Sequence, residues 1–187
     1  MSTPQLFKFS SPFQGVLLVE MNRYVYPVVW DAAKFLLRFS PPVNAFNKAF
    51  WRELGSVFGS IAKDGDVRVV VLASALPKLF TAGLDRPYSH FLSETGGLTE
   101  RQHIVVTEDS DLISTNGKQD ASRKAIVLRD HILEFQNAIS AIEKCPQPVI
   151  GAAHGVSFGL AVDILCACDI RYAASDARFS IKVVVNS

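Results

Sequence analysis

The sequence predicts an α/β fold with a mostly parallel sheet, because short apolar strands alternate with amphipathic helices along its 187 residues. Residues 67–73 are nearly all apolar and rich in β-branched side chains, which is typical of a strand covered on both faces. Residues 44–64 repeat apolar side chains at spacings of three and four, which predicts a helix. The length suits a single domain over residues 1–187, and a hydrophobic content of 49% excludes a disordered chain.

The other elements follow from the same patterns. Further strands are expected at residues 15–20, 148–153 and 170–174, and further helices at residues 121–144 and 160–167. The polar residues 90–120 are interpreted as a variable loop.

Two of the helices carry more detailed predictions. The first is expected to have Asn44 as its N-cap and to stop at Gly65. The core positions expected in the helix over residues 121–144 are Ile126, Leu133, Ile139 and Ile142.

The charge balance argues against a nucleic-acid partner. The chain has 19 Lys and Arg against 18 Asp and Glu, and it contains no basic run that would attract nucleic acid or an anionic membrane. Its most apolar stretch, residues 148–170, contains His154, Asp163 and Asp169. These polar groups are costly in a bilayer, so the stretch is interpreted as core and not as a membrane span.

The three cysteines, Cys145, Cys166 and Cys168, lie in apolar surroundings without a His-rich partner segment. They are therefore interpreted as reduced core thiols, and no metal site is expected. The first twenty residues hold one Lys and no Arg, so neither a secretory signal nor an Arg-rich transit peptide is expected. An intracellular location follows as the expectation.

Two junctions between a strand and a loop are the candidate functional segments. Residues 79–85 follow a buried strand, and residues 154–163 connect a strand to a helix. Ligands bind at the carboxyl ends of strands in open parallel sheets, and small residues there allow close backbone approach. Neither segment has the spacing of a phosphate-binding loop. From spacing alone, ordinary turn chemistry is the better explanation of each.

Three motifs, in this order, resemble the crotonase (enoyl-CoA hydratase/isomerase) superfamily. They are F-T-A-G-L-D at 80–85, P-V-I-G-A-A-H-G at 148–155 and C-D-I-R-Y-A at 168–173. The sequence is most similar to the Δ3,5-Δ2,4-dienoyl-CoA isomerase branch, especially its fungal members, and residues 42–54 match that branch too. The resemblance implies a crotonase-like ββα spiral that acts on enoyl- or dienoyl-CoA thioesters in fatty-acid β-oxidation or a related pathway. It implies no cofactor, because coenzyme A is part of the substrate.

The resemblance also implies an oxyanion hole for the thioester carbonyl, formed by the backbone N–H groups of Leu84 and Leu160. A helix N-terminus beside the second donor would favour the developing negative charge. The substrate-binding residues implied by position are Ala82, Gly83, Leu84, Asp85 and Gly159. The family usually has glycine where Leu160 stands. Leucine keeps the N–H but narrows the pocket and does not easily adopt a positive φ, so a simple core role for Leu160 is the alternative.

Asp163 is the candidate catalytic side chain, since the dienoyl-isomerase branch has an acidic catalytic residue at this position. A carboxylate flanked by apolar residues is costly to bury unless it is paired or used, and burial would suit it to proton transfer. The alternative is a structural role at a helix start or in a buried pair.

Three other polar residues are expected to be structural. Asp169 is expected to hold Arg171, and His154 is interpreted as a satisfied structural histidine. Asp85 is expected to anchor the first loop, with substrate contact as the alternative.

The C-terminal part of the sequence departs from the family pattern. Val183 stands where the family has a second catalytic carboxylate, and valine cannot carry a proton. The helical region that covers the acyl pocket and builds the family's trimer or hexamer is expected to be missing. The predicted function is therefore an acyl-CoA isomerase or hydratase impaired in this form. The alternatives are a non-catalytic acyl-CoA binder or assembly partner, or an erroneous gene model that does not fold.

Residues 24–40 have no counterpart in the family pattern. Without them, Arg23 would join Pro41 in the family's M-N-R-P-P-V-N order, and Arg-Tyr-Val is what a translated splice donor would encode. The segment is interpreted as an insertion or a retained intron. As a real insertion, its apolar residues are expected to form an extra helix over the pocket: Trp30, Phe35, Leu36, Leu37 and Phe39. Peroxisome is the compartment that the resemblance implies, with cytoplasm or mitochondrion as alternatives.

Overall fold

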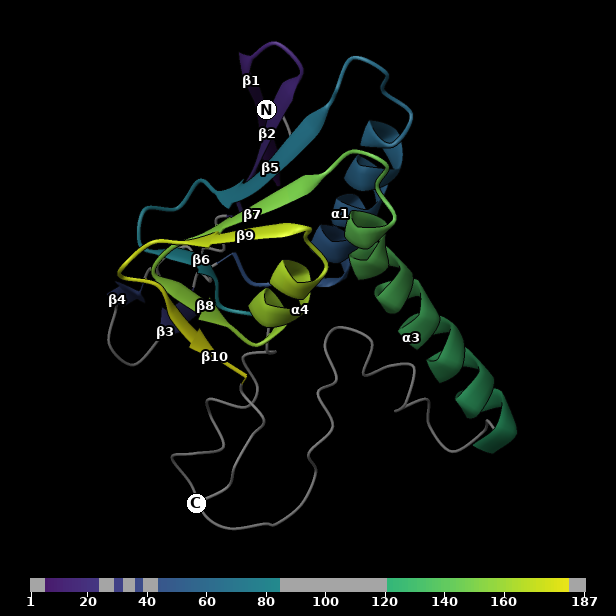
Figure 1. Ribbon diagram of the computed structural model, residues 1–187. Coiled ribbons are helices and arrows are strands. Elements are labelled where there is room, and N and C mark those ends of the chain that lie inside the picture. The colour runs from purple at the N-terminus through teal and green to yellow at the C-terminus, as the bar shows by residue number, and fades with distance from the viewer. Residues whose placement is uncertain (1–5, 24–28, 32–35, 39–43, 85–120, 182–187) are drawn as a thin grey trace.

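The computed structural model describes residues 6–23, 29–31, 36–38, 44–84 and 121–181. Its larger sheet has five strands in the order β1–β2–β5–β7–β9 (Figure 1). Their bounds are β1 Phe7–Phe13, β2 Val16–Met21, β5 Val69–Ser74, β7 Val149–Ala153 and β9 Ile170–Ala173. Only the β1–β2 pair in this sheet is antiparallel, and the other three neighbouring pairs are parallel.

A second, three-stranded sheet is parallel throughout, in the order β10–β8–β6. Its strands are β6 Leu79–Thr81, β8 Val156–Phe158 and β10 Arg178–Ser180. Strand β6 follows β5, β8 follows β7 and β10 follows β9 along the chain. Each turn of the spiral therefore adds one strand to the larger sheet and one to the smaller sheet. This arrangement confirms the predicted spiral of ββα units with a mostly parallel sheet.

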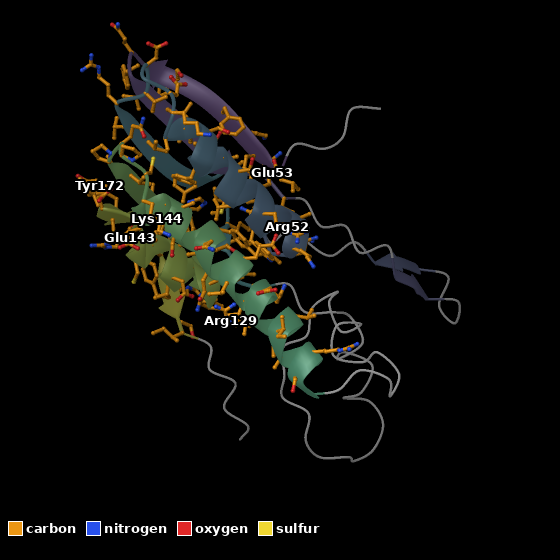
Figure 2. All side chains as sticks on the ribbon, turned by 90° about the vertical axis from the view of Figure 1, so that its right-hand side faces the viewer. Arg52, Glu53, Arg129, Glu143, Lys144 and Tyr172 are labelled. Atoms are coloured by element: carbon orange, nitrogen blue, oxygen red, sulfur yellow. The ribbon has the colours of Figure 1, made fainter. Side chains whose placement is uncertain are left out.

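Three helices lie in the described part of the chain: α1 Lys48–Ile61, α3 Ala121–Glu143 and α4 Leu160–Cys166. Helices α1 and α3 pack side by side (Figures 1 and 2), and Gly55 is the point of close approach. A Cβ built on Gly55 would lie 3.1 Å from the Cα of Ala138. Arg52, labelled in Figure 2, donates from Nε and Nη2 to the Glu134 carboxylate at 2.7 and 2.8 Å. None of the described helices combines the length and the apolar character that crossing a bilayer requires.

One apolar core joins the larger sheet to these helices. Its largest fully buried side chains include Phe7, Phe46, Phe50, Phe58 and Phe80. The strands predicted at residues 15–20, 67–73, 148–153 and 170–174 are all present, within one or two residues of the expected bounds. Strands β1, β6, β8 and β10 were not predicted.

The prediction that Asn44 is an N-cap is wrong. Helix α1 begins at Lys48, and its N-cap is Asn47, whose side-chain oxygen accepts the Phe50 N–H at 3.0 Å. Asn44 lies outside the helix with a φ of 45° and is fully buried. At the other end the helix stops at Ile61, before Gly65.

The predicted core face of α3 is half correct. Ile139 and Ile142 are buried, whereas Ile126 is 60% exposed and Leu133 is 39% exposed. The reason is a difference in length: α3 has 23 residues and α1 has 14, so the N-terminal half of α3 extends past its partner (Figure 1).

The extra helix expected within residues 24–40 is also wrong where the structure describes that segment. Val29–Asp31 (β3) and Leu36–Arg38 (β4) form an antiparallel two-stranded sheet. The backbone N–H of Arg23 donates to Asn44 Oδ1 at 2.8 Å, so the nearest described residues on either side of this segment lie together. The predictions for residues 90–120 and for Val183 lie outside the described residues.

Candidate functional site

The two candidate loops lie against one another at the ends of two parallel strands. Strands β6 and β8 are neighbours, so the loops that follow them emerge at the same edge of the small sheet. A Cβ built on Gly83 would lie 2.9 Å from the carbonyl oxygen of Phe158 and 3.5 Å from the backbone N of Leu160. The two backbones therefore make direct contact at this point.

Glycine at positions 83 and 159 allows this contact. Gly83 has a φ of +93° and Gly159 a φ of +56°, which side chains on an L-residue rarely permit. Leu160 does not share this conformation. The expected conflict between leucine and a positive φ therefore does not arise, because the preceding Gly159 takes that conformation.

Each glycine carbonyl is held by a protein donor. Phe46 N–H donates to the Gly83 carbonyl at 2.8 Å, and Val162 N–H donates to the Gly159 carbonyl at 2.9 Å. In a trans peptide the C=O and the following N–H point in opposite directions. The N–H groups of Leu84 and Leu160 are consequently directed away from the groups that hold these carbonyls.

The position of Leu160 is compatible with both of the roles that the sequence left open. Its side chain is buried in the core, 6% exposed. Its N–H belongs to the first residue of α4, where a helix offers no internal acceptor. A core side chain and a backbone donor are thus compatible at this position, because the donor does not depend on the side chain.

Asp163 is exposed. Its carboxylate is therefore not buried, and the expected energetic cost of burial is absent. It lies in the first turn of α4, where a negative charge also favours the helix electrostatically. This position is compatible with the structural alternative, and it leaves the carboxylate accessible to a ligand.

The remaining predicted residues have mostly structural contacts. His154 Nε2 lies 2.7 Å from the carbonyl oxygen of Leu76, in keeping with a structural histidine. Asp169 accepts the Val149 N–H at 2.8 Å, while Arg171 donates to the Cys168 carbonyl at 2.6 Å. The expectation that Asp169 holds Arg171 is thus replaced by separate backbone contacts.

Of the other two predicted binding residues, Ala82 and Asp85, the structure describes only Ala82. Ala82 is exposed in the first loop. Asp85 lies outside the described residues.

Sequence reasoning missed two residues that hold the first loop, Asn44 and Thr81. The Thr81 hydroxyl is fully buried; it donates to the Asn44 carbonyl at 2.7 Å and accepts the Gly83 N–H at 3.1 Å. The signal available in the sequence was a pair of polar residues, each one or two positions from a core phenylalanine. Periodicity alone assigned Asn44 to a helix cap.

An apolar cavity of about 430 Å³ lies between α4, β9 and β10. Apolar side chains dominate its lining, including Val162, Leu165, Tyr172, Phe179 and Ile181. Tyr172, labelled in Figure 2, is 66% exposed on the outer strand of the larger sheet. This edge of the molecule therefore presents apolar surface to solvent.

Comparison with known proteins agrees with this architecture. The model of the family described as enoyl-CoA hydratase/isomerase matches residues 34–96. The mitochondrial Δ3,5-Δ2,4-dienoyl-CoA isomerase of Mus musculus is 43% identical to this chain. The alignment covers 75% of this chain and 37% of the mouse protein. The peroxisomal enzyme of the same name from Arabidopsis thaliana is 35% identical over 82% of this chain and 49% of its own length.

Solved structures show the same fold. An enoyl-CoA hydratase from Mycobacterium smegmatis superposes with a TM-score of 0.62 at 18% identity, covering 94% of this chain and 49% of that one. The enoyl-CoA hydratase/carnithine racemase from Magnetospirillum magneticum gives a TM-score of 0.60 at 22% identity, with 99% and 54% covered. The chain spans about half the length, or less, of the relatives it matches. These structures show that the chain has the same fold, and its sequence similarity shows that it carries a domain of the enoyl-CoA hydratase/isomerase (crotonase) family.

Proposed function

We propose that this chain binds an enoyl- or dienoyl-CoA thioester and stabilises the enolate that forms when the acyl chain loses a proton. The observation that carries the proposal is the pair of glycine–leucine peptides at the ends of β6 and β8. In both, the glycine carbonyl is held by the protein and the leucine N–H is directed away from that contact. Similarity to dienoyl-CoA isomerases and enoyl-CoA hydratases supports this substrate class.

The thioester oxygen would accept hydrogen bonds from the N–H groups of Leu84 and Leu160. Charge accumulates on that oxygen as the C–H bond breaks, and each such donor is typically worth about 10²–10³ in rate. Isomerisation returns the proton to a different carbon, so the reaction needs a group that accepts it and a group that gives it back.

Asp163 is proposed as one of these proton carriers. It lies in the first turn of α4, three residues after the second donor, and its carboxylate is exposed. By resemblance the second carrier's position is Val183, so turnover is expected to be impaired. Mitochondrion or peroxisome is the proposed compartment, because the similar isomerases carry those names.

The test is a calorimetric titration of the chain with an enoyl-CoA and with free coenzyme A, followed by a turnover assay against Asp163→Asn. The proposal predicts saturable binding that is tighter for the thioester. It also predicts slow turnover that falls roughly tenfold or more in the Asp163→Asn variant. A folded chain that binds neither compound would contradict the proposal.

A non-catalytic binder or assembly partner is the second candidate function. The observation that favours it is the exposed apolar edge formed by Ile170, Tyr172, Phe179 and Ile181. Apolar patches of this kind often mark protein contacts. Saturable thioester binding with the same turnover in the chain and in Asp163→Asn would favour this function.

A further inference from the structure

We infer that Thr81 is a positioning residue: its buried hydroxyl, fastened to Asn44, sets the orientation of the Leu84 N–H toward the thioester oxygen. The inference rests on the proposed function and extends it to a side chain that does not touch the substrate. The supporting observation is a hydrogen-bond network that connects Asn44, Thr81 and Gly83.

Asn44 is the fixed point of this network. Its side-chain nitrogen lies within hydrogen-bond distance of the Met21 carbonyl at 3.2 Å, of Ser74 Oγ at 2.8 Å and of the Phe80 carbonyl at 3.1 Å. Asn44, which is fully buried, therefore connects the ends of β2 and β5 to the middle residue of β6. Its φ of 45° is in the left-handed region, which asparagine tolerates better than most residues.

Thr81 connects Asn44 to the first loop through two hydrogen bonds. Its hydroxyl donates to the backbone carbonyl of Asn44 at 2.7 Å, and the same oxygen accepts the Gly83 N–H at 3.1 Å. One buried oxygen thus determines the distance between the Asn44 backbone and the Gly83 backbone. No water is needed to satisfy either bond.

The peptide between Gly83 and Leu84 links this network to the Leu84 N–H. Phe46, two residues after Asn44, donates its N–H to the Gly83 carbonyl at 2.8 Å. Gly83 is therefore held at its N–H by Thr81 and at its carbonyl by Phe46. Because the peptide is planar, fixing the Gly83 carbonyl also fixes the direction of the Leu84 N–H.

A merely structural role for Thr81 predicts a different result. In that case, loss of the hydroxyl would lower the melting temperature and leave the polarisation of a bound carbonyl unchanged. A positioning role predicts a weaker polarisation in a chain that is still folded, because preorganised donors act only when they point at the oxygen. The two roles are therefore separable by a spectroscopic signal from the ligand.

The experiment measures the infrared stretching frequency of a ¹³C-labelled enoyl-CoA thioester carbonyl bound to the full chain. Thr81→Val removes the hydroxyl at nearly constant shape, and Thr81→Ser retains it. Ile142→Val changes a buried residue of α3 and is the control for a general loss of stability. Should Thr81→Val fail to fold, Thr81→Ala removes the hydroxyl without placing a methyl group against the Asn44 carbonyl.

The expected result is a shift to lower frequency in the wild-type chain, in Thr81→Ser and in Ile142→Val, with most of the shift lost in Thr81→Val. Where turnover is measurable, kcat should fall roughly tenfold in Thr81→Val, with KM little changed. A full shift retained in Thr81→Val would overturn this inference alone. An unshifted carbonyl on the wild-type chain would overturn the proposed function and this inference with it.

Discussion

At Gly83 the absence of a side chain lets the two loops touch. The residue has a φ of +93°, and a Cβ would lie 2.9 Å from the Phe158 carbonyl oxygen. Conformational strain and steric overlap therefore act together at this position. The sequence indicated a functional loop here through the F-T-A-G-L-D motif. The contact with the second loop depends on long-range strand pairing, which local patterns do not encode.

Replacing Gly83 with Ala should destabilise the fold by about 1–3 kcal/mol and weaken thioester binding, because the loops must separate to admit the methyl group. Chemical denaturation and a thioester titration measure the two effects. The matched control is Gly65→Ala, where a Cβ meets no atom within 4 Å. Equal stability of the two variants would contradict the close contact.

Two neighbouring cysteines, Cys166 and Cys168, differ in their burial. Cys166 is exposed and Cys168 is buried, and burial raises the pKa of the Cys168 thiol to about 11. At pH 8 an alkylating reagent should modify Cys166 and spare Cys168, because the thiolate is the reactive form. Mass spectrometry of the modified peptides tests this. Equal labelling rates at the two positions in the folded chain would be incompatible with the burial.

The same pKa shift has a consequence for stability. Since the folded chain favours the protonated Cys168 thiol, this contribution is complete below the ordinary thiol pKa near 9. It is lost as the pH rises toward 11. The interpretation of the cysteines as core thiols thus holds for Cys168 and is wrong for Cys166, which lies on the exposed face of α4.

Among the elements, α1 and α3 show what a periodic pattern can and cannot predict. The apolar spacing predicted both helices. It did not predict that the first half of α3 extends past α1 and exposes Ile126, because burial depends on the length of the helix that packs against it. The short strands β6, β8 and β10 have three residues each, too few for a periodic signal.

Two glycines of α1 test the helix contact as a matched pair. A Cβ at Gly55 would lie 3.1 Å from the Ala138 Cα, whereas a Cβ at Gly59 meets nothing within 4 Å. Gly55→Leu should cost about 1–3 kcal/mol by overpacking. The same substitution at the second position, Gly59→Leu, should add about 0.5–1 kcal/mol of stability, because leucine favours a helix more than glycine does. Thermal melts of the two variants measure the difference, and a shift of the same sign in both would contradict the contact.

At the scale of the whole molecule, the chain closes on itself at the boundaries of residues 24–43. Besides the bond from its backbone N–H to Asn44 Oδ1, Arg23 donates from its guanidinium to the Ala45 carbonyl. Because these flanking residues are joined, we expect that the segment can be removed without displacing the five-stranded and three-stranded sheets. The interpretation of residues 24–40 as an insertion or retained intron stays a prediction.

A variant that lacks residues 24–40 should fold with the same or a higher melting temperature. The three residues left between Arg23 and Asn44 can span about 14 Å, more than the hydrogen-bonded ends require. The shorter connection should add roughly 1–2 kcal/mol of loop-closure free energy. Circular dichroism melts of the two chains test this, and loss of cooperative unfolding in the shortened chain would show that the segment is needed for the fold.

The fold class and the two loops could be predicted because they depend on apolar patterning and on three ordered motifs. The exposure of Asp163 and the network around Asn44 could not, since both depend on which distant segments meet. The proposed oxyanion site consists of two backbone groups that no side-chain pattern reveals, the N–H groups of Leu84 and Leu160.

The most direct measurement is the amide chemical shift of these two residues in a ¹⁵N-leucine-labelled chain, titrated with an enoyl-CoA and with free coenzyme A. Leu84→Met and Leu160→Met identify the two signals, since each variant loses one leucine resonance and keeps the backbone N–H. If both groups bind the thioester oxygen, both amide protons should move downfield with the thioester and much less with coenzyme A. If the thioester binds to saturation and leaves both signals unmoved, the proposed oxyanion site is wrong.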